Sequence, residues 1–94
     1  MQIVWLRAAL INLDAVAEYI AMENPAAAAN VVSKILQQIE QLKDQPALGR
    51  PGRVMGTREL VISDTHYLVP YRIQNNQVQI LRVFHTSQQL PKKW

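Results

Sequence analysis

The sequence of 94 residues contains no cysteine and only two histidines. Without a thiol there is no disulfide framework, no thiolate nucleophile and no zinc or iron site with sulfur ligands. Two histidines without any cysteine also argue against a metal site built from nitrogen ligands. We therefore expect a protein without a bound metal or cofactor.

Long apolar stretches are also missing. The longest runs fall far short of the ~20 apolar residues that a helix needs to cross a bilayer. The segment from Met1 to Trp5 is typical of a strand, and it has neither the charged segment nor the cleavage site of a signal peptide. These absences predict a soluble, cytoplasmic protein that makes no membrane contact.

The composition is that of a folded chain, with 49% hydrophobic and 18% charged residues. We expect one domain over residues 1–94, of modest stability because a chain this short buries only roughly 60–65% of its unfolded surface. The charge is uneven. Residues 1–44 carry three basic and five acidic side chains (net −2), whereas residues 45–94 carry seven basic and two acidic (net +5). The second half should therefore attract an acidic partner, either a nucleic acid or an acidic protein segment.

Apolar residues at helical spacing predict two helices after a short first strand over Gln2 to Leu6. The first helix should run from Arg7 to Met22 and the second from Pro25 to Asp44, with Asn24 as its N-cap and Pro25 at its first position. The predicted buried stripes are Leu6, Leu10, Leu13, Val16, Ala17 and Ile20 in the first helix and Val32, Ile35, Leu36, Ile39 and Leu42 in the second.

The rest of the chain indicates a loop and three strands. Proline and glycine predict a solvated loop from Gln45 to Gly56. Three runs rich in β-branched and aromatic residues follow, and polar turns at residues 63–65 and 74–77 separate them; the runs are Gly56 to Ile62, Tyr67 to Ile73 and Val78 to His85. The predicted fold is α+β, in the order strand, helix, helix and a three-stranded antiparallel meander, with both helices on one face of the sheet.

Two residues do not fit this pattern. Pro70 lies in the middle strand although it lacks the N–H of a ladder bond, so the sequence predicts either a bulge or a shorter strand there. Arg82 shares a row with Val78, Ile80 and Phe84, which predicts a charge within an apolar row. A buried arginine is usually paired, so Arg82 either pairs with Glu59 across the sheet or presents its charge to an acidic partner.

The order of the elements and several short segments resemble the RelE/ParE superfamily of bacterial toxins, and the resemblance covers nearly the whole chain. The segments that carry it are Gly49 to Arg53, Gly56 to Val61, Tyr67 to Ile73, Val78 to His85, and Gln88 with Pro91. The resemblance implies the toxin of a type II toxin–antitoxin pair. Its expected partner is a small antitoxin protein, through which the complex contacts operator DNA indirectly.

The superfamily has two activities. RelE-like members cut mRNA on the ribosome, with basic residues on the sheet, a basic residue after the last strand and a tyrosine near the C-terminus. In this chain the middle-strand position is Leu68, the position after the last strand is Gln88, and no tyrosine follows Tyr71. ParE-like members poison DNA gyrase and have no nuclease activity. The ending Ile80 to Ser87 is closer to this branch, so we favour a ParE-like growth inhibitor and keep the ribosome-dependent mRNA endonuclease as the alternative.

The candidate site residues follow from these two readings. A gyrase poison would need no catalytic group, and its target contacts are expected at Arg58, Arg82, His85, Lys92, Lys93 and Trp94. A nuclease would use His85, Arg58 and Arg82 as catalytic residues, because metal-free RNA cleavage needs a base, an acid and cations. A third reading is a degenerate toxin that only titrates its antitoxin. Each of these residues also has a purely structural interpretation. His85 then hydrogen-bonds its backbone neighbours, Tyr67 and Tyr71 lie in the core, and residues 92–94 are a frayed end.

Overall fold

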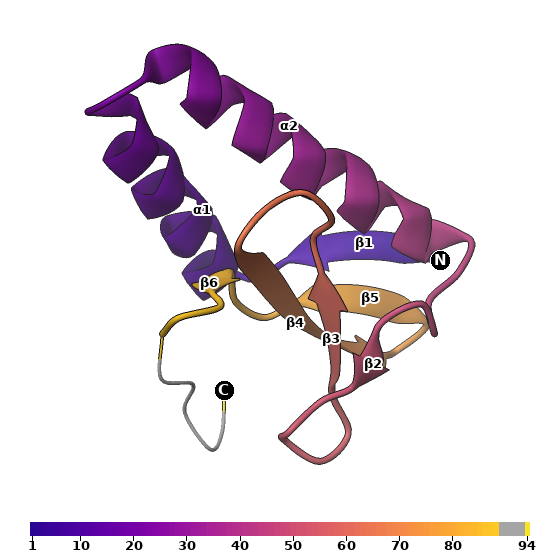
Figure 1. Ribbon diagram of the computed structural model, residues 1–94. Coiled ribbons are helices and arrows are strands. Elements are labelled where there is room, and N and C mark those ends of the chain that lie inside the picture. Colours follow the sequence, from indigo (N-terminus) through magenta and orange to yellow (C-terminus); the bar gives the residue numbers. More distant parts are fainter. Residues whose placement is uncertain (89–93) are drawn as a thin grey trace.

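The computed structural model describes residues 1–88 and 94, and places two helices against a mixed six-stranded sheet (Figure 1). The elements in chain order are β1 (Gln2–Trp5), α1 (Arg7–Ala21), α2 (Pro25–Glu40), a single 3-10 turn (Gln41–Lys43), β2 (Arg50–Pro51), β3 (Arg58–Val61), β4 (Tyr67–Gln74), β5 (Gln77–Ile80) and β6 (Phe84–His85). The predicted α+β class and order of elements are confirmed.

The sheet has the order β1-β5-β4-β3-β2, and β6 pairs with β4 beside the end of β5. β1 runs parallel to β5, and the other pairs are antiparallel. The first strand, predicted over Gln2 to Leu6, therefore forms one edge of the sheet. The prediction of an irregular loop over residues 45–56 is wrong at Arg50 and Pro51, which form the short edge strand β2.

The connections follow the local chemistry of the chain. The Asn24 side chain accepts a hydrogen bond from the N–H of Ala27 at 3.1 Å, and Pro25 occupies the first turn of α2, as predicted. Between β4 and β5, Asn75 and Asn76 both adopt positive φ angles of 54° and 57°. This conformation is the one that a two-residue hairpin turn requires, and asparagine tolerates it better than most residues.

The core lies between the helices and one face of the sheet. It is formed by Ala9, Ile35, Ile39, Leu42, Leu60, Ile62, Tyr67, Val69, Tyr71, Val78, Ile80 and Val83. The prediction of burial is wrong for two residues, because Leu10 is 48% exposed and Leu36 is 44% exposed. The small side chains of Ala9 and Ala28 are buried instead.

Pro70 lies inside an unbroken β4 that extends from Tyr67 to Gln74. Its carbonyl accepts a hydrogen bond from the N–H of Leu81 at 2.9 Å. Because the N and O of a strand residue point to the same neighbour, the missing N–H faces the segment between β5 and β6. There, Val69 and Pro70 lie opposite three residues, 81–83. The predicted bulge therefore exists, but the extra residue belongs to the neighbouring strand.

The bulge also explains Arg82. One additional residue shifts the alternation of side chains by one position. Val78 and Ile80 face the core before the bulge, whereas Val83 faces it afterwards. The prediction that Phe84 and Arg82 share the row of Val78 and Ile80 is therefore wrong.

Candidate functional site

Arg58 lies on β3 opposite Tyr71 of β4. Its guanidinium Nη1 donates to the carbonyl of Gly49 at 2.7 Å and to that of Ala47 at 3.4 Å. Arg58 therefore fastens the loop that precedes β2 to the sheet. The N–H groups of Arg58 Nη1 are therefore directed toward carbonyls of its own chain.

Tyr71 holds the same loop from the core side. Its hydroxyl donates to the carbonyl of Pro46 at 2.6 Å and accepts from the N–H of Gly49 at 2.9 Å. Burial raises the pKa of Tyr71, although the Gly49 N–H and the charge of Arg58 act in the opposite direction. A Cβ on Gly49 would lie 2.6 Å from Tyr71 Cε1, so only glycine fits. The predicted core position of Tyr71 is confirmed.

Glu59 is the one buried charged residue within the described part of the chain, with 3% of its surface exposed. Its Oε1 lies 3.2 Å from Nη2 of Arg50, and its Oε2 lies 3.4 Å from Nε of Arg53 and 3.1 Å from the Arg53 backbone N. Burial alone would raise the pKa of Glu59, but the hydrogen bonds and charges of the two arginines outweigh it and lower the pKa. The prediction that Glu59 pairs with Arg82 is wrong. Arg50 and Arg53 are closer because β2 lies beside β3.

Arg82 lies on the sheet face away from the helices, together with the C-terminal residue. Its Nη2 donates to the backbone O of Trp94 at 2.8 Å and its Nη1 to the carbonyl of Leu81 at 2.8 Å. The Trp94 ring lies against Phe84, with 5.4 Å between ring centroids. Its Nε1 donates to the Thr57 hydroxyl at 3.5 Å. Trp94 is therefore anchored on this face, whereas Lys92 and Lys93 lie outside the described residues.

A pocket of about 510 Å³ lies on the same face. Arg72 and Arg82 contribute two guanidinium groups to it, and Met55 at 97% and Ile73 at 42% exposure add apolar surface. Neither arginine forms an ion pair with an aspartate or glutamate side chain among residues 1–88 and 94. We call these four residues, with Trp94, the basic sheet face. It suits a partner that combines negative charge with apolar groups.

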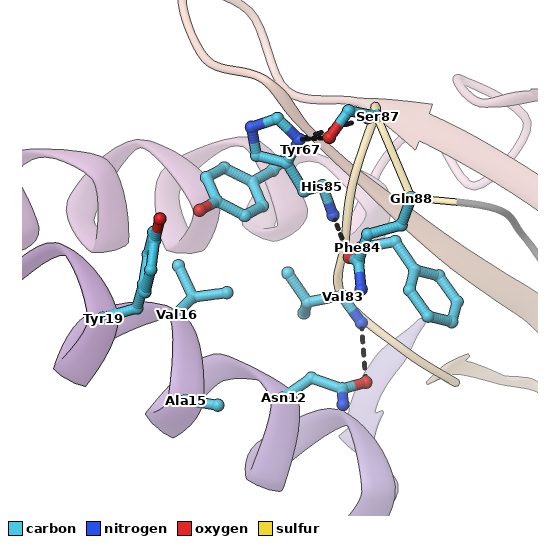
Figure 2. A pocket seen from close by; sticks show the side chains of 10 residues that line it. All are labelled: Asn12, Ala15, Val16, Tyr19, Tyr67, Val83, Phe84, His85, Ser87 and Gln88. Carbon is cyan, nitrogen blue, oxygen red and sulfur yellow. Dashed lines mark hydrogen bonds between the residues drawn. The ribbon is translucent and has the colours of Figure 1, made fainter.

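His85 occupies a different pocket, of about 440 Å³, between α1 and the last strand (Figure 2). Its Nδ1 accepts from the N–H of Ser87 at 3.1 Å and lies 2.7 Å from the Ser87 hydroxyl, so the neutral ring carries its proton on Nε2. The Tyr67 ring meets the imidazole edge-on at 5.2 Å between centroids. His66 is exposed, and its ring centroid lies 5.7 Å from that of His85.

None of the ten residues that line this pocket is a lysine, arginine, aspartate or glutamate. Arg82 lies on the basic sheet face, and Arg58 binds the loop before β2. The three residues of the predicted nuclease site thus lie in three separate environments. Groups of three or more histidine, aspartate or glutamate side chains that could hold a metal ion are absent from the described part of the chain. Among the same residues no helix is long and apolar enough to cross a membrane.

Sequence reasoning missed the contacts of Glu59, Arg50 and Arg53. A usable signal was present, because Glu59 directly precedes the apolar run of Leu60, Val61 and Ile62. A carboxylate in that position needs partners, and the preceding loop supplies two arginines, Arg50 and Arg53.

Comparisons with known proteins agree with this architecture. Residues 3–90 match the family model described as the ParE toxin of the type II toxin–antitoxin system parDE. The chain is 47% identical over 88 residues to the protein Y4kP of Sinorhizobium fredii, covering 94% of this chain and 91% of that protein. It is 30% identical over 86 residues to toxin RelE2 of Caulobacter vibrioides, covering 92% and 96%.

A solved structure is also similar. A chain of the chromosomal ParDE toxin–antitoxin system of P. aeruginosa superposes with a TM-score of 0.81 at 31% identity, over 90% of this chain and 95% of that one. The family match over nearly the whole sequence and these relatives show that this chain belongs to the ParE family of toxins of type II toxin–antitoxin systems.

Proposed function

We propose that this protein is a cytoplasmic growth inhibitor that acts on DNA gyrase through the basic sheet face and is neutralised by a cognate antitoxin. The observation that carries the choice of target is the separation of Arg58, Arg82 and His85. Metal-free RNA cleavage needs a base, an acid and cations around one phosphate, within hydrogen-bond reach of it. Here the imidazole lies in a pocket whose lining contains no cation, and the arginines lie elsewhere.

The state of His85 supports the same choice. A general base must offer an unprotonated nitrogen to its substrate. In the neutral His85 ring that nitrogen is Nδ1, which already accepts from Ser87. The resemblance to RelE-like nucleases places a basic residue at the middle-strand position that is Leu68 in this chain. Leu68 is 3% exposed and carries no charge.

The basic sheet face supplies what a protein or DNA-bound target would need. Arg72 and Arg82 present guanidinium groups that form no ion pair with an aspartate or glutamate side chain among the described residues. Met55 and Trp94 add apolar and aromatic surface beside them. Arginine and tryptophan are the residue types most enriched where binding energy is concentrated.

Plasmid cleavage by purified gyrase tests the proposal. The protein should cause linear plasmid to accumulate when gyrase and ATP are present, and none when gyrase is omitted. Replacing Arg82 by glutamine should reduce the linear product by about tenfold or more, the effect expected for loss of a binding hot spot. The matched control is Arg7→Gln, an exposed arginine at the start of α1, which should leave the product unchanged. Full activity of the Arg82→Gln variant would remove the basic sheet face from the proposal.

The alternative function is ribosome-dependent mRNA cleavage, and one observation favours it. Tyr67 and His85 meet in a pocket of about 440 Å³ that a nucleotide could enter. Cleavage of ribosome-bound mRNA by the purified protein, lost in a His85→Ala variant, would replace gyrase poisoning by this function.

A further inference from the structure

The outer edge of β3 is paired at both ends and open in the middle. The Ile62 N–H donates to the carbonyl of Tyr67 at 3.0 Å, so Ile62 points toward the β4 side. In an antiparallel sheet successive residues direct their backbone groups to opposite neighbours. Leu60 therefore also faces β4, whereas the N–H and C=O of Glu59 and Val61 point outward.

Both neighbours of Val61 on this edge have partners. Glu59 lies opposite Arg50, and β2 extends no further along β3 (Figure 1). Beyond Val61, the Ser63 N–H donates to Oε1 of Gln38 at 2.8 Å, and Nε2 of Gln38 donates to the Ser63 carbonyl at 3.2 Å. The side-chain amide of Gln38 thus imitates one residue of a neighbouring strand.

Val61 itself is left open. Across residues 1–88 and 94, no hydrogen bond reaches its outward N–H or C=O. Residues 59 and 63 stand about 13 Å apart along the edge, which is room for three extended residues. A pocket of about 360 Å³ lies at this place between α2 and β3, and its lining includes Gln38, Leu48, Arg50 and Val61.

The surroundings define what fits the opening. Val61 and Leu48 are 45% and 44% exposed, so an apolar side chain can lie against them. The Arg50 side chain is 56% exposed although one edge of it binds Glu59, so it can receive a further carboxylate. An amide group matches both the donor and the acceptor of Val61, whereas a phosphate could match only the donor. A peptide therefore fits better than a nucleic acid.

We propose that the open position at Val61 binds the backbone of an extended segment of the antitoxin by strand addition, and this inference rests on the proposed neutralisation by an antitoxin. One residue of that segment pairs with the N–H and C=O of Val61. An apolar neighbour covers Leu48 and Val61, and an acidic residue reaches Arg50. Backbone pairing of this kind supplies affinity, while the two flanking side chains supply specificity.

Amide hydrogen exchange measured residue by residue tests this pairing, with the toxin alone and in complex with its cognate antitoxin. The Val61 amide should exchange rapidly in the toxin alone and at least about tenfold more slowly in the complex, because a new hydrogen bond protects it. The Leu60 amide faces β4 and is the internal control, since it should be protected in both states.

Two substitutions of the same residue provide an independent readout. Val61→Pro removes the outward N–H without removing a bond to β4, and proline is tolerated at such edge positions. We expect this variant to bind the antitoxin about tenfold more weakly, because it loses one hydrogen bond and its ring disturbs the close fit of the added strand. Val61→Thr keeps the N–H and the β-branched shape and should change the affinity by less than about twofold. Should the proline variant not fold, the exchange measurement on the natural sequence decides alone.

The possible failures are distinguishable. A complex that forms while Val61 exchanges as in the free toxin would overturn this inference and leave the proposed neutralisation intact. Protection of Val61 that rises with the concentration of toxin alone would mean that a second copy occupies the edge, which also overturns it. A toxin that binds no antitoxin at all would overturn the proposed neutralisation and this inference together.

Discussion

The hydroxyl of Tyr71 joins the core to the loop that carries Arg50 and Arg53, and its removal gives the sharpest stability prediction. In a Tyr71→Phe variant the Gly49 N–H and the Pro46 carbonyl lose their partner at 2.9 and 2.6 Å. Each hydrogen bond contributes about 1 kcal/mol, and a donor left buried without a partner adds about 1–3 kcal/mol. We expect the free energy of unfolding to fall by about 2–4 kcal/mol, which lowers Tm by roughly 10–25 °C in a domain of this size.

Tyr67→Phe is the matched control for this change. Tyr67 lies on the same strand and is also buried, but its hydroxyl has no hydrogen-bond partner among the described residues. Its removal should change the free energy of unfolding by less than about 0.5 kcal/mol. Thermal and urea unfolding followed by circular dichroism would measure both variants, with equal urea m-values as the sign of a comparable unfolded state. Equal losses of stability in the two variants would refute the anchoring role of Tyr71.

Further predictions concern the same contacts. Glu59→Gln should reduce stability by about 2 kcal/mol at neutral pH, because charge-assisted hydrogen bonds to Arg50 and Arg53 are lost. The lowered pKa of Glu59 means that its contribution is present above the ordinary value of 4.5 and disappears as pH falls through the lower folded value, so natural protein and variant should converge in acid unfolding curves. The raised pKa of Tyr71 gives the opposite pH dependence: its contribution to stability is present below pH 10 and is lost at higher pH. The difference in unfolding free energy between the natural protein and Tyr71→Phe should therefore decrease in alkaline solution. Gly49→Ala should destabilise by about 1–3 kcal/mol through its clash with Tyr71, measured by urea unfolding, and an unchanged midpoint would show that the loop can move aside. Asn24→Ala should lower the unfolding free energy by about 1 kcal/mol in the same assay by removing the cap of α2.

Much of the fold was predictable because it depends on local patterns. The period of the apolar residues located α1 and α2, and the pair Asn24 and Pro25 located the boundary between them. Asn75 and Asn76 marked the hairpin between β4 and β5. Each of these signals acts within a few residues, so the sequence contains all that is needed to interpret it.

The errors come from contacts between distant parts of the chain. Which residues of a helix face inward depends on how the helix packs against the rest of the fold, and Ala9 and Ala28 are buried while Leu10 and Leu36 are exposed. The bulge beside Pro70 belongs to a strand that follows it by more than ten residues, so the phase of Val83 and Phe84 could not be derived from their own strand. β2 has only two residues, too few for any pattern to predict.

The candidate site was predictable in its residue types but not in its arrangement. The sequence located the excess of positive charge in residues 45–94. It did not show which arginines pair with a carboxylate of the same chain and which do not. In the structure Arg50 and Arg53 pair with Glu59 and Arg58 binds loop carbonyls. Arg72 and Arg82 form no ion pair with an aspartate or glutamate side chain of the described residues. This division follows from the strand register, which places Glu59 beside β2 and Arg82 within the bulge.

The central claim is that the protein acts on DNA gyrase rather than on mRNA. It is tested most directly by inducing the natural protein and a His85→Ala variant from a tightly controlled promoter and following DNA, RNA and protein synthesis in the first minutes. We predict that DNA synthesis stops first, with filamentation and an SOS response, and that the variant behaves like the natural protein. A prompt fall in protein synthesis that spares DNA synthesis, and that His85→Ala abolishes, would contradict the claim and make His85 a catalytic residue.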